Sequence, residues 1–170
     1  MIRAFRDWFL DQLGLYAAYH TDWRNQLTHY VGVPIIIFSI LIVLDQVPIG
    51  GRFSAALLVL GLLLVSYLIA APLVGLASTL VCFPLYLLME SVATLSAVSQ
   101  WAIAGACFAI GWIIQFIGHA FEGRRPAFTV NGLQVLVAPA FLVAELLFAA
   151  GLQRDLAGIL EAKARKYARS

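Results

Sequence analysis

Charged residues are scarce in this chain of 170 residues. Asp, Glu, Lys and Arg make up 12% of it, whereas 62% of the residues are hydrophobic. Soluble domains carry roughly 25% charged residues. A soluble protein of this size could not bury so much apolar side-chain area, because a large share of a small domain's surface faces water. The composition therefore excludes an ordinary soluble domain and indicates a protein whose solvent is the lipid bilayer.

The chain also has few cysteines and only a small net positive charge. Cys82 and Cys107 lie inside apolar segments, where we expect small buried hydrophobic residues and not a redox or metal-binding pair. The formal net charge is +2, and no basic stripe alternates with aromatic residues, so nucleic acid is not an expected partner. The first 30 residues lack a continuous apolar core, which argues against a cleavable signal peptide.

Long uncharged runs fill the middle of the chain. Residues 53–89 contain no Asp, Glu, Lys or Arg, and neither do residues 91–121. A helix needs about 20 apolar residues to cross a hydrocarbon layer of roughly 30 Å. We predict membrane segments at residues 31–44, 53–71, 72–89, 101–121 and 133–151, the first of them preceded by a polar helical start at residues 23–29. The predicted fold class is all-α: one membrane-embedded domain over residues 1–170, a polytopic transmembrane bundle with four or five membrane segments.

Amphipathic helices flank these segments. In residues 2–18 the apolar side chains recur at three- and four-residue spacing, and we place this helix flat in the membrane interface. Residues from 153 onward predict a basic amphipathic helix. Between the first helix and the first membrane segment, Thr21 and Asp22 predict the N-cap of a new helix.

The segment order predicts which residues share a membrane face. Four crossings return the end of the fourth segment to the side where the first one begins, so His29 and His119 lie at the same face. With five full crossings Lys and Arg divide almost evenly, and the positive-inside rule then gives no orientation. If the segment around Pro139 dips in and returns, both termini and nearly all cations share one face. We favour this second arrangement.

The chain has three histidines, His20, His29 and His119. Asn25 lies four residues before His29, which places the two on one face of a helix. His20 and His29 lie on opposite sides of an unbroken helix, because nine residues separate them. They converge only if the chain breaks at the predicted N-cap.

A carboxylate and two guanidinium groups follow the third histidine. Glu122 lies three residues after His119, a spacing that helical metal sites use, and is either a ligand or a supporting residue. Neutral imidazoles bind Fe, Zn or Cu, and histidines with a carboxylate and open positions suit Fe(II) and O₂ chemistry. Arg124 and Arg125 either anchor the helix end at the interface or bind a substrate carboxylate.

Three strings carry a family resemblance: YHTDWRNQLTHYVGVP (Tyr19–Pro34), QFIGHAFEGRRPAF (Gln115–Phe128) and APAFLVAE (Ala138–Glu145). They resemble the membrane 2-hydroxy fatty acid dioxygenase family of fatty-acid α-oxidation. The resemblance spans most of the chain and implies a multi-span enzyme. Such an enzyme uses Fe²⁺ and O₂ to convert a 2-hydroxy fatty acid into CO₂ and a chain shortened by one carbon.

The resemblance also implies roles for individual residues. The three histidines would be the iron ligands or their immediate neighbours, and Asn25 and Glu122 would support or complete the site. One of the two arginines would bind the substrate carboxylate. The expected catalytic residues are therefore Asn25, Glu122, Arg124 and Arg125. A long-chain 2-hydroxy fatty acid, O₂ and the lipid bilayer are the expected partners, and a homo-oligomer is compatible with this interpretation.

Two other classes of function stay open. The chain could be a Zn²⁺-dependent membrane hydrolase or another lipid-modifying enzyme, or a transporter or scaffold in which the histidines are structural. The identity of the bound metal and the requirement for O₂ discriminate between them. Ala- and Arg-rich usage favours the bacterial inner membrane, whereas a eukaryotic member of the family belongs to the endoplasmic reticulum.

Overall fold

The computed structural model describes residues 1–51, 53–123 and 125–167, without the side chain of residue 128. In these ranges the chain is mainly helical, which confirms the predicted fold class. The elements are α1 (Ile2–Ala18), α2 (Trp23–Asp45), β1 (Pro48–Gly50), β2 (Phe53–Ser54), α3 (Ala55–Ala70), α4 (Pro72–Ala93), α5 (Ala97–Glu122), the 3₁₀ turn η1 (Ala127–Thr129), α6 (Gln134–Ala149) and α7 (Arg154–Tyr167).

Three helices, α2, α4 and α5, are long and apolar enough to cross a membrane. Most of their surface is not buried within the protein: only 22% of the most apolar window of α5 is covered. Exposed apolar side chains of this extent need a lipid environment. The protein is therefore membrane-associated.

The two shorter apolar helices, α3 and α6, have 16 residues each, which gives them a length of about 24 Å. We predicted that the second membrane segment begins at Phe53. In the structure, Phe53 and Ser54 instead form β2, which pairs antiparallel with β1. The turn predicted at Gly50–Gly51 joins these strands, and its positive φ angles favour glycine. Strands this short leave no sequence pattern from which to predict them.

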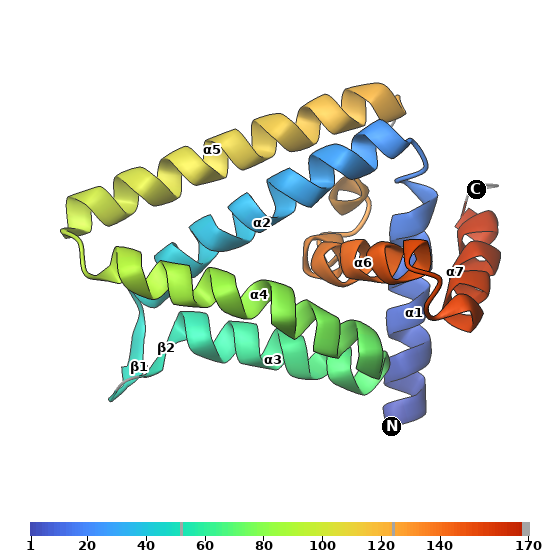
Figure 1. Ribbon diagram of the computed structural model, residues 1–170, viewed down its shortest axis with the longest axis horizontal. Coiled ribbons are helices and arrows are strands. Elements are labelled where there is room, and N and C mark those ends of the chain that lie inside the picture. The colour runs from blue at the N-terminus through green and yellow to red at the C-terminus, as the bar shows by residue number, and fades with distance from the viewer. Residues whose placement is uncertain (52, 124, 168–170) are drawn as a thin grey trace.

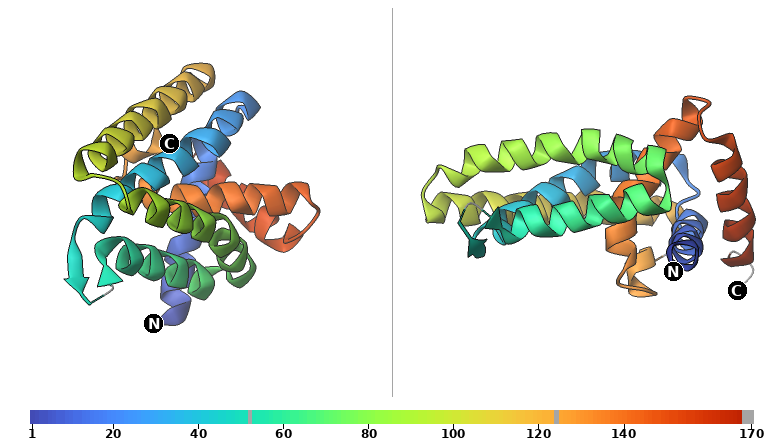
Figure 2. Two further views of the ribbon diagram at one scale, coloured as in Figure 1. Left: turned by 60° about the vertical axis from the view of Figure 1, so that its left-hand side comes forward. Right: turned by 90° about the horizontal axis from the view of Figure 1, so that it is seen from below.

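Helices α2 to α5 run back and forth between two ends of the bundle (Figure 1). The β1–β2 hairpin and the α4–α5 turn lie at one end. Helix α1 lies across the other end, beside the start of α2 and the end of α5, and α6 runs from the middle of the bundle toward it (Figure 2). Both termini therefore lie at one end of the molecule (Figure 1), and the membrane face that this end occupies stays a prediction.

Helix α7 packs on α1 at this end. Leu156 and Leu160 on α7 are buried, and the ammonium group of Lys163 donates to the carboxylate of Asp11. A side chain at Gly14 would meet the Cβ of Lys163 at 2.4 Å, so the glycine allows the close approach of the two helices. The predicted basic amphipathic tail is thus a helix docked by its apolar face.

Helices α2 and α5 pack closely through glycine. A Cβ at Gly118 would come within 2.0 Å of the Thr28 hydroxyl oxygen, and one at Gly111 within 2.5 Å of Ile36. Small residues at membrane helix interfaces let the two backbones approach. This contact aligns the beginning of α2, which carries His29, with the end of α5, which carries His119.

Candidate metal centre

The break between α1 and α2 positions His20. Helix α1 ends at Ala18, and α2 begins after the N-cap residue Asp22. The Asp22 carboxylate accepts from the Arg24 amide at 2.8 Å and pairs with the Arg24 guanidinium at 2.7 Å. The bond from the Arg24 side chain lowers the pKa of Asp22 to about 2, so the cap stays ionised. The predicted N-cap is confirmed.

The three histidines meet at this break. His20, His29 and His119 are all buried, and each offers a ring nitrogen such that the three atoms lie within 4.8 Å of one another. The structure thus brings together three histidines that were expected at one membrane face, and their role as metal ligands stays a prediction. They form a group that can hold a metal ion.

The backbone sets the tautomers of two of these rings. The Nδ1 of His20 donates to the carbonyl oxygen of Tyr16 at 2.7 Å, and the Nδ1 of His29 donates to that of Asn25 at 2.8 Å. A carbonyl only accepts, so Nδ1 carries the hydrogen in both rings and Nε2 carries the lone pair. These two Nε2 atoms lie 3.1 Å apart. Two facing lone pairs at this distance repel each other, and a cation bound by both nitrogens would remove the repulsion.

A metal ion fits this role better than a proton does. Burial lowers the pKa of His20 well below its usual range, and the neighbouring His29 and His119 lower it further. A neutral imidazole is the form that binds metal, and metal–nitrogen bonds of about 2.1 Å allow two ligands to lie 3.1 Å apart on one ion. The Nδ1 of His119 is buried and has no hydrogen-bond partner in the described part of the chain. Three imidazoles suit Fe²⁺ and Zn²⁺ alike.

Tyr16 packs directly on this group. Its ring is stacked on that of His20, with centroids 3.8 Å apart and planes 2° apart. It also meets His29 edge-on and contacts Phe141 on α6. Sequence reasoning did not select Tyr16, although it lies in the last turn of α1, four residues before His20. The ring holds the imidazole in position and shields it from water.

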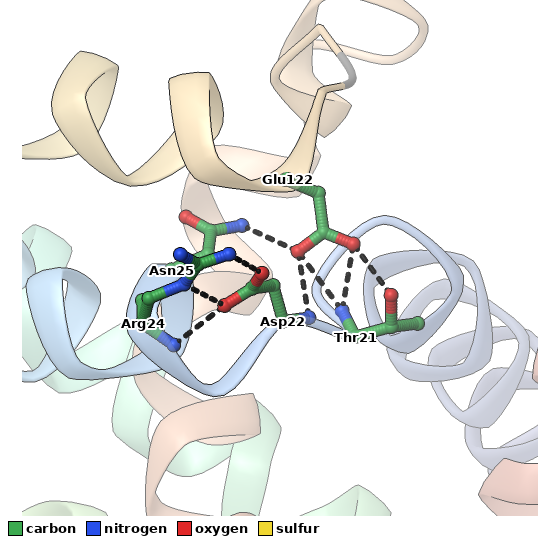
Figure 3. Close-up of polar contacts among 5 residues, drawn as sticks. All are labelled: Thr21, Asp22, Arg24, Asn25 and Glu122. Atoms are coloured by element: carbon green, nitrogen blue, oxygen red, sulfur yellow. Dashed lines mark hydrogen bonds and ion pairs between the residues drawn. The ribbon is translucent and has the colours of Figure 1, made fainter.

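Glu122 joins the end of α5 to the turn that carries His20 (Figure 3). Its carboxylate accepts from the backbone amides of Thr21 and Asp22 at 3.0 and 2.9 Å, and from the Thr21 hydroxyl at 2.6 Å. The side-chain amide of Asn25, which is fully buried, donates to it at 3.1 Å. Glu122 and Asn25 therefore fix the position of His20 relative to His119, and their part in catalysis stays a prediction.

The two arginines are less closely tied to the centre. Arg125 is exposed and does not line either of the cavities described below. Arg124 lies outside the residues that the structure describes. Binding of a substrate carboxylate by either arginine stays a prediction.

An apolar cavity of about 130 Å³ extends from the histidines into the bundle. Tyr16 and the three histidines lie at its head, and its walls are mainly apolar residues of α2, α3 and α6. Ile40, Val59 and Leu136 line it while being 36%, 41% and 47% exposed. The cavity is therefore open on the side where α2, α3 and α6 face lipid.

A second, more polar cavity, of about 580 Å³, also lies beside His20. It lies between α1, α6 and α7, and Gln26, Glu145, Glu161 and Arg165 line it. His20 thus borders both an apolar cavity and a more polar one.

Known proteins are similar to this chain over most of its length. The family model described as "2-hydroxy-palmitic acid dioxygenase Mpo1-like" matches residues 7–150. A curated protein from Saccharomyces cerevisiae, 2-hydroxy-palmitic acid dioxygenase MPO1, is 37% identical over 153 residues, which cover 88% of this chain and 86% of the yeast protein. No solved structure matches the chain.

Proposed function

The chain belongs to the Mpo1-like 2-hydroxy-palmitic acid dioxygenase family, and we propose that it removes one carbon from long-chain 2-hydroxy fatty acids with O₂ and a bound Fe²⁺. The observation that carries the proposal is a buried group of three histidines at the head of an apolar cavity. The histidines suit the polar head of a 2-hydroxy fatty acid, its carboxylate and hydroxyl. The apolar cavity suits its acyl tail.

The cavity supports an amphiphilic substrate that arrives from the bilayer. The acyl tail enters sideways between α2, α3 and α6, where the lining residues Ile40 and Leu136 are exposed. Each buried methylene group contributes about 0.8 kcal/mol in an apolar environment. The tail therefore stays among apolar side chains, and the carboxylate and hydroxyl come to lie beside the histidines. The polar cavity beside His20 gives water-soluble products a way out.

The reaction balances without a further reductant. An acid RCH(OH)COOH and O₂ give RCOOH, CO₂ and H₂O, with cleavage of the bond between the carboxyl carbon and the hydroxyl-bearing carbon. The two carbons lose four electrons in total, which is the number that reduces O₂ fully. The proposal thus predicts that no NAD(P)H or other electron donor is consumed.

His20, His29 and His119 would hold the Fe²⁺. When bound, the ion would supply the redox chemistry that the reaction of O₂ with a closed-shell acid needs. Asn25 and Glu122 keep His20 and His119 in register through the bonds around Thr21. Tyr16 and Phe141 pack on the imidazoles and keep the apolar cavity free of bulk water.

The basic residues of the described chain support a location and an orientation. Those on α1, on α7 and at the start of α2 lie at the end of the bundle that carries the histidines. Such an excess of Lys and Arg marks the cytoplasmic side of a membrane protein. We place the centre at the cytoplasmic face, and we propose the bacterial inner membrane from the Ala- and Arg-rich composition alone.

The test uses purified protein freed of metal and then reloaded with either Fe²⁺ or Zn²⁺. 2-Hydroxyhexadecanoic acid is supplied with or without O₂, and pentadecanoic acid is measured by mass spectrometry alongside released CO₂. We expect both products only with Fe²⁺ and O₂. Unchanged substrate under these conditions would contradict the proposal, and conversion with Zn²⁺ or without O₂ would favour a hydrolase or another lipid-modifying enzyme.

A further inference from the structure

Gln115 is a polar residue in the wall of the apolar cavity. It lies on α5, one turn before His119 on the same helical face, and is only 4% exposed. Its carbonyl oxygen Oε1 is buried without a hydrogen-bond partner among the residues that the structure describes. A buried acceptor without a donor destabilises the protein, because the free energy of its lost hydration is not compensated. A group that brings a donor into the cavity would remove this cost.

Neighbouring residues hold the Gln115 amide at this depth. A Cβ at Gly32 on α2 would come within 3.2 Å of the Gln115 Nε2, so the missing side chain makes room for the amide. Val33 and Ile36, which also line the cavity, are buried and apolar. Gln115 therefore places a polar amide between α2 and α5, about 6 Å along the helix axis from His119.

We propose that Gln115 distinguishes 2-hydroxy fatty acids from unmodified ones by accepting a hydrogen bond from the 2-hydroxyl group. This inference rests on the proposed function. An ionised carboxylate offers only acceptors, whereas a hydroxyl carries one O–H donor. The hydroxyl is thus the one donor on the head of the substrate at neutral pH. A site with a buried acceptor rejects an analogue that lacks the hydroxyl, because the acceptor then stays unpaired.

Gln134 is the competing candidate. It also lines the cavity, and its Oε1 is likewise buried without a partner within the described ranges. Its Nε2, however, donates at 2.9 Å to Gln12 on α1, whose oxygen also accepts from Asn131 at 2.8 Å. Gln134 therefore ties the start of α6 to α1. Gln115 lies on the helix of a candidate ligand, so its amide is held in register with the histidine group.

The experiment measures how strongly the protein prefers the hydroxylated ligand. A fluorescent fatty acid is displaced from metal-loaded protein in nanodiscs by 2-hydroxyhexadecanoic acid or by hexadecanoic acid. The ratio of the two affinities is compared for the wild type, Gln115→Met and Gln134→Met. Gln100→Met is the matched control, because Gln100 is a buried glutamine that bonds to Gln46 at the opposite end of the bundle. Methionine keeps the length of glutamine and removes its hydrogen bonding.

We expect the wild type to prefer the hydroxy acid at least tenfold and Gln115→Met to bring the ratio close to one, with hexadecanoic acid still bound. The two other variants should keep the preference. A ratio unchanged in Gln115→Met, or lost only in Gln134→Met, would overturn the inference and leave the proposed function intact. A wild type without any preference would contradict the proposed substrate class itself.

A ligand series on the wild type tests the same point without a mutation. 2-Fluorohexadecanoic acid carries a small acceptor in place of the hydroxyl and has no O–H to donate. It should bind about as weakly as hexadecanoic acid. If the fluoro acid binds as tightly as the hydroxy acid, the O–H donor is not recognised. This result would contradict the proposed role of Gln115.

Discussion

The Nε2 atoms of His20 and His29 lie 3.1 Å apart, although nine residues separate the two histidines in the sequence. Both rings donate through Nδ1 to a backbone carbonyl four residues earlier. Both facing nitrogens are therefore acceptors. The arrangement is stable with a cation between them, and the low pKa of His20 favours a metal ion over a proton.

Gly118→Ala should weaken metal binding. A Cβ at this position would meet the Thr28 hydroxyl oxygen at 2.0 Å and the Asn25 Oδ1 at 2.5 Å. Helices α2 and α5 must then separate beside His29 and His119. We expect at least a tenfold loss of Fe²⁺ affinity, measured by titration against a chelator of known affinity. Gly105→Ala on the same helix meets nothing within 4 Å in the described structure and is the control. Equal affinities in the two variants would contradict the packing argument.

Glu122→Ala should loosen the turn that carries His20. The substitution removes the acceptor of the Thr21 and Asp22 amides and of the Asn25 side chain. Loss of a residue that orients metal ligands typically costs about 10–100-fold in affinity, and we expect a loss in this range by the same titration. The control is Glu90→Ala, which changes an exposed carboxylate near the end of α4. A variant that binds iron as the wild type does would leave Glu122 no positioning role.

The ring of Tyr16 should matter more than its hydroxyl. Tyr16→Phe keeps the ring stacked on His20 and should bind iron as the wild type does, whereas Tyr16→Ala removes it. The alanine variant should also lose about 3–5 kcal/mol of stability, as is typical for the loss of a buried aromatic side chain. Thermal unfolding and metal titration of both variants check this prediction. A phenylalanine variant as weak in iron binding as the alanine variant would show that the hydroxyl is required.

Filling the apolar cavity should separate substrate binding from metal binding. Ile37 lines the cavity, so Ile37→Trp is expected to raise the KM for 2-hydroxyhexadecanoic acid at least tenfold while the iron content stays unchanged. Val43→Trp, on the exposed face of the same helix, is the matched control. Should both variants turn over the substrate with the wild-type KM, the acyl chain would not occupy this cavity.

Much of the architecture follows from local sequence patterns. Apolar periodicity predicted α1 over the residues it occupies, and the length of the apolar runs predicted α2, α4 and α5. The break at Asp22 was predictable because N-capping is local chemistry. Counting crossings predicted that His29 and His119 lie at one face, and the predicted break allowed His20 to join them; the short distances between the rings depend on the packing of α2 against α5.

The remaining features depend on long-range contacts that no local pattern encodes. The stacking of Tyr16 on His20 and the polar cavity beneath α7 arise from the way α1 lies across the bundle. The sequence alone could have suggested Gln115 as a site residue, because it is an amide within an apolar helix, four residues before His119. Its unpaired oxygen becomes evident only from the position of α2.

The metal content of the purified protein tests the central claim most directly. We predict one iron ion per chain after loading with Fe²⁺, measured by mass spectrometry of the metal. The ion should be lost in each of the variants His20→Ala, His29→Ala and His119→Ala and retained in the exposed-surface control Glu90→Ala. Wild-type protein that takes up no stoichiometric metal, or histidine variants that keep it, would contradict the account.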